Sequence, residues 1–354
     1  MTDLEKLCSR VTEAADCAVI TDDVNRRYFT AMKSSAGNLV VFPEKAYFII
    51  DFRYIEKARK TVTACEVILQ DKLYEQINEL IEKHGAKTVA VNADTCTLSE
   101  LIAYQQKLNA EVIADTKLAK IITEIRTVKS QEQIDKMIKA QRIAEKGFAH
   151  MLDFIKVGRT EKEIQLELDY YMLKNGAEAL SFDTIALSGA NTSLPHGVPS
   201  DKKVESGEFV LMDFGATYDG WHSDMTRTVC VGKPSDKMKS VYETVLTAQL
   251  TALDAVKAGM SGKALDKIAR DIITDAGYGD NFGHSLGHGV GVEIHESPYA
   301  SPSREDILPE NSIVTIEPGI YLEGKFGVRI EDFVVVTENG CINMTKAPKE
   351  LICL

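Results

Sequence analysis

Four acidic residues in the C-terminal half stand in or beside short apolar segments with a strand-like pattern. Asp213 and Asp224 are eleven residues apart and flank a turn at Tyr218-Asp219-Gly220. If the turn is centred between Tyr218 and Asp219, the two acids face each other directly; if Asp219-Gly220 is its centre, they are diagonal neighbours on one face. Either arrangement places their Cβ atoms about 5–8 Å apart. Carboxylates this close require a cation or a retained proton, unless both simply lie solvated on an exposed strand face.

Glu317 and Glu331 repeat this pattern in a second predicted hairpin. Glu317 ends the apolar run Ile313–Glu317, and Glu331 follows the apolar-flanked Val328-Arg329-Ile330. An acid inside an apolar strand is costly unless it is paired or bound to a metal. A buried ion pair of Arg329 with Glu331 or Asp332 is the alternative, and it would account for one of the two acids.

Three of the seven histidines fall between Gly283 and His295. His284 and His288 have the spacing of one helical turn, but the glycines between and around them make a helix unfavourable. Glycines here would permit close approach of the backbone to a ligand. The glycine spacing does not match a dinucleotide-binding fingerprint. Any one of these histidines could be structural, but the cluster favours a function.

The charges of these residues balance two divalent cations. Four carboxylates carry four negative charges, and one imidazole adds a neutral nitrogen. Such ligands suit Mn²⁺ or Co²⁺, with Zn²⁺ also possible, and we expect Mn²⁺. Two metal ions can deprotonate a water held between them and so supply a hydroxide nucleophile at neutral pH. The chain has no H-E-x-x-H motif, which argues against a zincin.

The elements that must position these side chains follow from local signals. Capping boxes at Ser130/Gln133 and Thr160/Glu163 predict two helices, the first ending before Gly158 and the second at Asn175-Gly176. Two further helices are expected near Lys237–Lys257 and Lys263–Ala276. The hairpins Glu208–Val231 and Ile313–Val336 alternate with these helices. Each half of this region therefore offers helices and one hairpin that carries carboxylates.

A smaller α/β domain is predicted ahead of this region. Short apolar strands at Leu39–Phe42 and Ala46–Ile50 flank a break at Pro43-Glu44, and Thr88–Val91 is a further buried strand. A helix is expected over Arg53–Lys60 and another ending near His84-Gly85. Because Glu124–Lys129 is polar, we place the boundary there, giving domains 1–125 and 126–354.

Composition and charge exclude several classes of function. A net charge of −12 argues against nucleic acid or an anionic membrane surface as partner, because both need a basic protein surface. The first ten residues do not read as a signal peptide, and the apolar runs are too short to span a bilayer. Seven cysteines without C-x-x-C spacing indicate reduced thiols. We expect a cytoplasmic protein.

At these residues the sequence resembles metallopeptidase family M24, which has the pita-bread fold and includes methionine aminopeptidase, aminopeptidase P and prolidase. The resemblance covers Lys129 to the C-terminus and implies an α+β catalytic domain preceded by a smaller α/β creatinase-type domain. The family's metal ligands, in the order Asp, Asp, His, Glu, Glu, fall on Asp213, Asp224, His288, Glu317 and Glu331.

The proline-specific branch of the family is favoured by three features. An N-terminal domain is present, and its segments Asn25–Tyr28 and Asp51–Tyr54 resemble that domain in aminopeptidase P and prolidase. Val328–Asp332 has an arginine that methionine aminopeptidases do not usually carry, and Pro195-His196-Gly197 also matches the branch. The resemblance therefore implies an exopeptidase that cleaves the Xaa-Pro bond at the N-terminus of short peptides.

The resemblance also implies roles for individual residues. Glu317 would shuttle a proton as well as bind metal, His295 would stabilise the tetrahedral intermediate, and His196 would contact the scissile carbonyl or the leaving proline. His284 would line the proline pocket. Arg329 and Tyr321 would order the residues around the metals.

Several alternatives remain at this point. The Ser181–Thr184 run resembles small bacterial enzymes of the aminopeptidase type, which favours that activity slightly over a dipeptidase. A non-catalytic binding protein and a methionine aminopeptidase-like enzyme share the fold, as does the metal-free creatinase. The retained ligands argue against the first and last of these. A homodimer is the expectation from the family.

Overall fold

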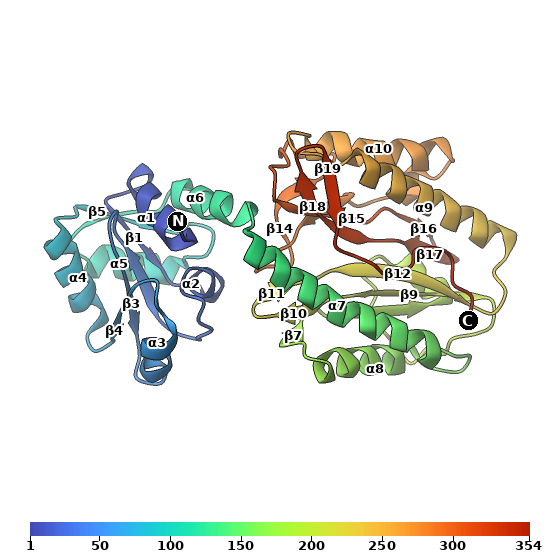
Figure 1. Cartoon of the computed structure of the whole chain (residues 1–354), viewed down its shortest axis with the longest axis horizontal. Helices are drawn as coiled ribbons and strands as arrows, with labels where there is room; N and C mark the ends of the chain where they lie inside the picture. Colours follow the sequence, from blue (N-terminus) through green and yellow to red (C-terminus); the bar gives the residue numbers. More distant parts are fainter. The chain divides into compact units, whose positions relative to one another are not determined.

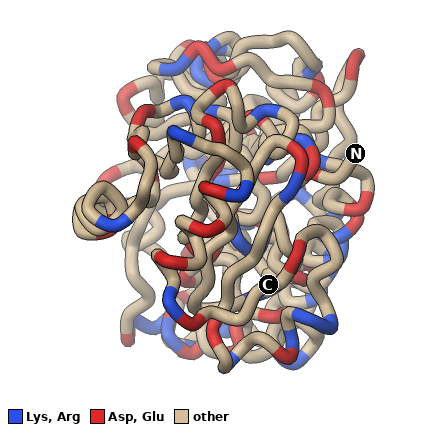
Figure 2. Tube along the Cα trace, turned by 90° about the vertical axis from the view of Figure 1, so that its left-hand side faces the viewer, with Lys and Arg blue, Asp and Glu red and all other residues tan.

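The computed structural model describes all 354 residues, and its internal contacts divide the chain into two units, Met1–Arg126 and Thr127–Leu354. Each unit is described by itself (Figure 1). No helix is both long enough and apolar enough to cross a membrane. On the face drawn in Figure 2, lysine and arginine positions are interspersed with aspartate and glutamate positions and form no continuous basic stripe.

The N-terminal unit is built on one six-stranded sheet in the order β4-β3-β2-β1-β5-β6. The pairs β1/β2 and β2/β3 are antiparallel, whereas β3/β4, β1/β5 and β5/β6 are parallel. Its strands are β1 Cys17–Ile20, β2 Asn38–Val41, β3 Ala46–Ile50, β4 Glu66–Leu69, β5 Thr88–Val91 and β6 Glu111–Ile113. The hairpin predicted around Pro43-Glu44 is β2/β3.

Helices cover both faces of this sheet, which explains why its central strands read as continuous apolar runs. Leu39 and Val41 of β2 belong to the hydrophobic core on one face, and Val40 belongs to the core on the other. The helical segments are α1 Asp3–Arg10, η1 Val11–Glu13, α2 Asp23–Thr30, α3 Ile55–Thr61, α4 Leu73–His84, α5 Leu98–Lys107 and α6 Lys117–Thr127.

The C-terminal unit has two pairs of long helices: α7 Gln131–Phe154 with α8 Glu161–Lys174, and α9 Asp236–Ala255 with α10 Gly262–Asp275. Both predicted capping boxes form: the N-cap hydroxyls of Ser130 and Thr160 accept hydrogen bonds from backbone N–H groups, and Gln133 and Glu163 accept bonds from the N-cap N–H groups. Two short 3-10 helices complete the set, η2 Gly189–Ser193 and η3 Gly279–Asn281.

The strands of this unit form two three-stranded sheets, β12-β9-β8 and β15-β18-β19, and three smaller ones, β11-β10-β7, β13-β14 and β16-β17. Their bounds are β7 Ala179–Leu180, β8 Ile185–Ser188, β9 Glu208–Phe214, β10 Ala216–Tyr218, β11 Trp221–His222, β12 Met225–Val231, β13 Gly287–Gly289, β14 Glu296–Ala300, β15 Ile313–Ile316, β16 Gly319–Leu322, β17 Phe326–Arg329, β18 Asp332–Thr337 and β19 Gly340–Asn343.

Each helix pair covers one part of this curved strand layer (Figure 1). Phe148 of α7 and Leu168 of α8 share a buried core with Met212 of β9. Val245 of α9 and Val334 of β18 belong to a second core. The repeat that the sequence indicated, a helix pair with a hairpin in each half, is therefore present. The polar side chains of the hairpins lie on the face of the strand layer that the helices do not cover.

Candidate metal centre

The register of the first hairpin decides between the two placements of Asp213 and Asp224. Tyr218 pairs with Trp221, so the turn is centred on Asp219-Gly220. Both turn residues have positive φ angles, 49° and 83°, as a tight two-residue hairpin loop requires. Asp213 pairs with Thr226. Asp224, two residues before Thr226, is therefore the diagonal neighbour of Asp213 on the same face.

The second hairpin is interrupted at its two acids. Ile316 pairs with Asp332 and Gly319 pairs with Arg329, but Glu317 and Glu331 lie in the gap between these ladders. The N–H of Glu331 instead donates to the carbonyl of Thr226 in the first hairpin, at 3.1 Å, and that of Glu317 donates to Leu286 at 2.9 Å. These bonds join the second hairpin to neighbouring segments, and they bring its two acids beside those of the first.

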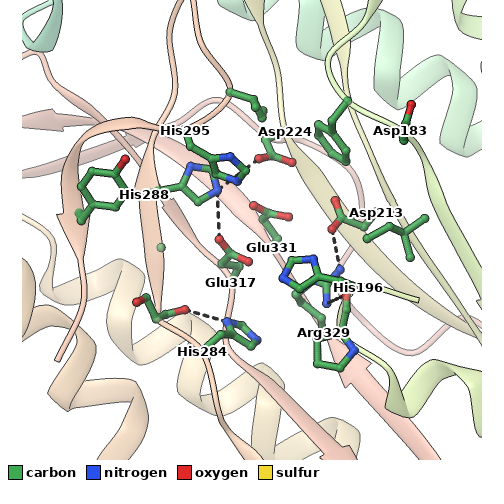
Figure 3. Close-up of a pocket in the computed structure, with 17 residues that line it drawn as sticks. Asp183, His196, Asp213, Asp224, His284, His288, His295, Glu317, Arg329 and Glu331 are labelled. Carbon is green, nitrogen blue, oxygen red and sulfur yellow. Dashed lines mark hydrogen bonds and ion pairs between the residues drawn. The ribbon is translucent and has the colours of Figure 1, made fainter. Parts of the chain in front are cut away.

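The four acids and one imidazole converge in the structure (Figure 3). Asp224, His288 and Glu331 each offer a ligand atom, and these atoms lie within 4.8 Å of one another. Nε2 of His288 is 3.3 Å from Oε1 of Glu317 and 3.6 Å from Oδ2 of Asp224. Its Nδ1 donates to the carbonyl of Gly289 at 3.1 Å, which orients Nε2 toward the carboxylates.

One oxygen of Asp213 has no protein partner. Oδ2 accepts a 2.5 Å hydrogen bond from Nη2 of Arg329, whereas Oδ1 is buried and unbonded. A buried carboxylate oxygen without a donor is costly, so it is suited to a cation. Together with the donor set, four carboxylates and one imidazole, this orphaned oxygen fits a pair of divalent ions.

The pKa shifts in the cluster also favour a site for cations. Burial raises the pKa of Asp224 well above its ordinary value, and the charge of Asp213 adds to the effect. Burial and the charge of Asp224 likewise raise the pKa of Glu331. Burial would lower the pKa of His288, but its hydrogen bond with Glu317 raises it instead. Without metal ions, these carboxylates therefore resist ionisation and His288 holds a proton.

A chain of polar contacts leads from Asp213 to His284. Nη1 of Arg329 donates to the Tyr321 hydroxyl at 2.7 Å, and that hydroxyl lies 2.9 Å from Nε2 of His284. The ion pair considered for Arg329 is therefore wrong in its partner: Arg329 pairs with Asp213, and Asp332 pairs with Arg227. The packing of the two hairpins against each other therefore determines which arginine pairs with which aspartate.

Gly287 and Gly289, on either side of His288, permit close packing of neighbouring strands. A Cβ on Gly287 would lie 1.9 Å from the Thr315 carbonyl, and one on Gly289 would lie 2.5 Å from the Glu296 carbonyl. The space expected for a ligand is thus taken by the backbones of β14 and β15. The close approach is needed to hold β13, with His288, against these strands.

The cluster opens into a cavity of about 470 Å³. Its lining includes every candidate residue from the sequence except Tyr321, which lies behind Arg329. His196 and His295 are both exposed to this cavity, and the ring centroids of His295 and His288 are 4.4 Å apart. Phe182, Ile185, Ile294 and Tyr299 add apolar walls, and of these only Phe182 and Ile294 belong to segments singled out from the sequence.

Two buried threonines were also missed. Thr226 donates to Oε2 of Glu331 at 2.7 Å, and Thr315 donates to Oε1 of Glu317 at 3.1 Å. Thr226 lies two residues after Asp224, and Thr315 lies two residues before Glu317. Residues two positions apart in a strand point to the same face, so the spacing of each threonine from its neighbouring acid could have identified it from the sequence.

Comparisons with known proteins identify the family of the chain. Residues 135–338 match the model of metallopeptidase family M24, and residues 4–128 match the creatinase/prolidase N-terminal domain. The Xaa-Pro dipeptidase of Pyrococcus furiosus is 39% identical over 99% of both chains.

Two solved structures resemble the whole chain. The Xaa-Pro dipeptidase from Bacillus anthracis has a TM-score of 0.95 and 41% identity, covering 99% of both chains. The X-Pro aminopeptidase from Thermotoga maritima has a TM-score of 0.91 and 38% identity, covering 96% of this chain and 98% of that one. The expected α+β architecture is confirmed, and the chain belongs to metallopeptidase family M24, with a creatinase/prolidase-type N-terminal domain before its pita-bread domain.

Proposed function

We propose that this protein is a metallo-exopeptidase that hydrolyses the Xaa-Pro bond of dipeptides, with two divalent ions held by Asp213, Asp224, His288, Glu317 and Glu331. One observation carries the proposal: these five side chains converge on one cavity, where Oδ1 of Asp213 is buried without a partner. The membership of family M24 supports it, as do the relatives named Xaa-Pro dipeptidase.

When bound, the two ions would activate a water as the nucleophile and polarise the scissile carbonyl. Residues of the chain bind the substrate and transfer the proton. The carboxylate-rich centre attracts the free α-ammonium of the substrate, which explains electrostatically why cleavage is confined to the N-terminus. Glu317 accepts the proton of the attacking water and passes it to the leaving nitrogen.

Three histidines and the apolar walls complete the site. His295, next to His288, donates to the oxygen that becomes negative in the transition state. His196 contacts the scissile carbonyl or the leaving proline. His284, held by the Tyr321 hydroxyl, lines the pocket for the proline ring. Arg329 fixes Oδ2 of Asp213, and the unbonded Oδ1 would be available as a metal ligand.

The preference for dipeptides is the finer part of the proposal. The Ser181–Thr184 run favours an aminopeptidase in the sequence, and one similar structure is named an X-Pro aminopeptidase, but the relatives at 39% and 41% identity are named Xaa-Pro dipeptidases. The test is to load the purified protein with Mn²⁺ and compare the cleavage of Ala-Pro with that of Ala-Pro-Ala. Selective cleavage of Ala-Pro is expected, and chelation should abolish it.

The other outcomes of this experiment are equally informative. Cleavage of the tripeptide with little turnover of the dipeptide would make the enzyme an aminopeptidase. Failure to cleave either peptide, with no metal bound, would favour a non-catalytic binding protein of the same fold.

The role of His295 has a separate test. His295→Ala should keep both metal ions and lower kcat by about 10²–10³-fold, because it removes a donor to the transition state and no metal ligand. Metal content by elemental analysis distinguishes the cases. Loss of metal from this variant would mean that His295 is itself a ligand.

We further propose Mn²⁺ as the native metal, a homodimer and a cytoplasmic location. The mostly oxygen ligands support Mn²⁺, and metal analysis of protein purified without added metal tests this. The seven free cysteines are typical of a reducing compartment. The homodimer is the family's expectation, and light scattering of the purified protein tests it.

A further inference from the structure

Glu161 is a buried carboxylate that lies outside the metal cluster. It begins α8, and its side chain is inaccessible to solvent. A buried carboxylate is stable only when hydrogen bonds replace its hydration. The groups that donate to Glu161 are neutral amides and hydroxyls, and all of them belong to one segment of the chain.

Six hydrogen bonds connect Glu161 to this segment. Its Oε1 accepts from the N–H and hydroxyl of Ser188, at 2.7 and 3.1 Å, and from Nδ2 of Asn191 at 3.0 Å. Its Oε2 accepts from the N–H and hydroxyl of Ser200, at 3.0 and 2.6 Å, and from the same Nδ2 at 3.2 Å. One carboxylate therefore holds both ends of residues 188–200, which we call the His196 segment.

This segment delivers His196 to the cavity. The His196 side chain is exposed, so its position depends on the backbone that carries it more than on packing around the ring. The segment is also bonded to β17: Nη1 of Arg329 donates to the carbonyl of Pro195 at 3.4 Å, and the N–H of Gly327 donates to the Thr192 hydroxyl at 2.8 Å. A shift at either end of the segment would move His196 relative to the cluster.

We propose that Glu161 is a positioning residue for the reaction, and that it acts by fixing the His196 segment. Its side chain does not line the cavity, and its six hydrogen bonds go to none of the five proposed metal ligands. Its six bonds close an eleven-residue loop between Ser188 and Ser200 into one conformation. This inference rests on the proposed function, because it presumes that His196 contacts the substrate during Xaa-Pro hydrolysis.

The test uses Glu161→Gln in the full-length, Mn²⁺-loaded enzyme. Gln keeps the shape but places an NH₂ group against the N–H and hydroxyl donors. With Ala-Pro as substrate, kcat should fall by about 10- to 100-fold because a small displacement of a catalytic group is this costly. The metal content should stay at that of the unaltered enzyme.

A double-mutant cycle separates positioning from a general structural role. If Glu161 acts through His196, adding Glu161→Gln to His196→Ala should lower kcat by less than about twofold more, because coupled residues are not additive. Glu163→Gln is the matched control: it changes an exposed acid in the same helical turn and should leave kcat unchanged. If Glu161→Gln does not fold, Ser200→Ala removes a single bond to Oε2 and takes its place in the cycle.

Each outcome has a clear meaning. Multiplicative losses in the double variant, or loss of metal from Glu161→Gln, would overturn the inference because Glu161 would then support the fold at large. An unchanged kcat in Glu161→Gln would overturn it as well. Failure of the unaltered, metal-loaded enzyme to cleave Ala-Pro or Ala-Pro-Ala would instead refute the proposed function, before any variant is compared.

Discussion

Glu331 and Asp332 are adjacent in the sequence and both are buried, yet they lie in opposite electrostatic surroundings. Asp332 accepts hydrogen bonds from Arg227 at 2.7 Å and Lys349 at 2.8 Å, and from the amides of Gln249 and Asn343. We call these five residues the Asp332 cluster. Burial would raise the pKa of Asp332, but the charges of Arg227 and Lys349 outweigh it and lower the pKa.

Glu331, just before β18, instead lines the cavity together with Asp213, Asp224 and Glu317, the other carboxylates of the proposed metal site. Thr226 donates to Glu331, and Asp224 and Glu317 face it with like charge. The two clusters teach that burial alone does not distinguish a structural acid from a ligand. The number of cationic donors distinguishes them. The Asp332 cluster contains two cations for one carboxylate, whereas the proposed metal site has more carboxylates than cationic side chains.

Removing a metal-site acid should give the largest effect on function. In Asp224→Asn, metal binding and Xaa-Pro cleavage should both be lost, because a ligand is gone. The stability of the chelated variant should be no lower than that of the chelated unaltered protein, because one repelling charge has been removed. Activity, elemental analysis and thermal unfolding measure these three results. Full activity in this variant would refute the two-metal assignment.

The Asp332 cluster should respond in the opposite way. Asp332→Asn leaves the buried Arg227 and the half-buried Lys349 without their counter-charge and should lower the free energy of unfolding by about 3–5 kcal/mol. Urea unfolding of the chelated proteins measures this. Asp271→Asn, which breaks an exposed ion pair with Lys267, is the control and should change little. A stability equal to that of the unaltered protein would remove the contrast between the two clusters.

The pH dependence of the chelated protein sharpens the comparison. Folding raises the pKa values of Asp224 and Glu331. The destabilisation of the folded state by these two carboxyl groups is therefore absent below the ordinary carboxyl pKa and grows as the pH rises toward the raised values. The chelated Asp224→Asn variant should therefore gain stability over the chelated unaltered protein as pH rises from about 4 to neutrality. A difference that stays constant over this range would contradict the raised pKa values.

The smallest effect is expected at the edge of the Asp332 cluster. Lys349 is 19% exposed in its side chain and supplies one of the two cations. Lys349→Met should lower the free energy of unfolding by about 1.5–3 kcal/mol, because one charged hydrogen bond is lost while Arg227 remains. Metal content and kcat should not change. A loss as large as that of Asp332→Asn would mean that Arg227 contributes little.

Much of the local structure follows from the sequence. The capping boxes at Ser130 and Thr160, the strands β5 and β12 and the existence of a turn within residues 218–220 depend on neighbours a few residues away, and such signals can be read along the chain. The centre of the turn needed the strand pairing of the structure. The residue types and spacing of the four acids and of the three clustered histidines nominated part of the cavity lining, whereas the roles of His196 and Arg329 came from the family resemblance. Their assignment to metal binding and catalysis stays a prediction until the variants are made.

Only the tertiary structure decided which partner each charged group takes. Arg329 pairs with Asp213 rather than with a near neighbour, and Glu161 holds the segment that carries His196. Gly287 and Gly289 make room for neighbouring strands. The sequence alone determined what chemistry these residues can perform, because that is a property of their types. Their pairing needed the folded chain, because hydrogen bonds between residues tens or a hundred positions apart depend on how the hairpins pack.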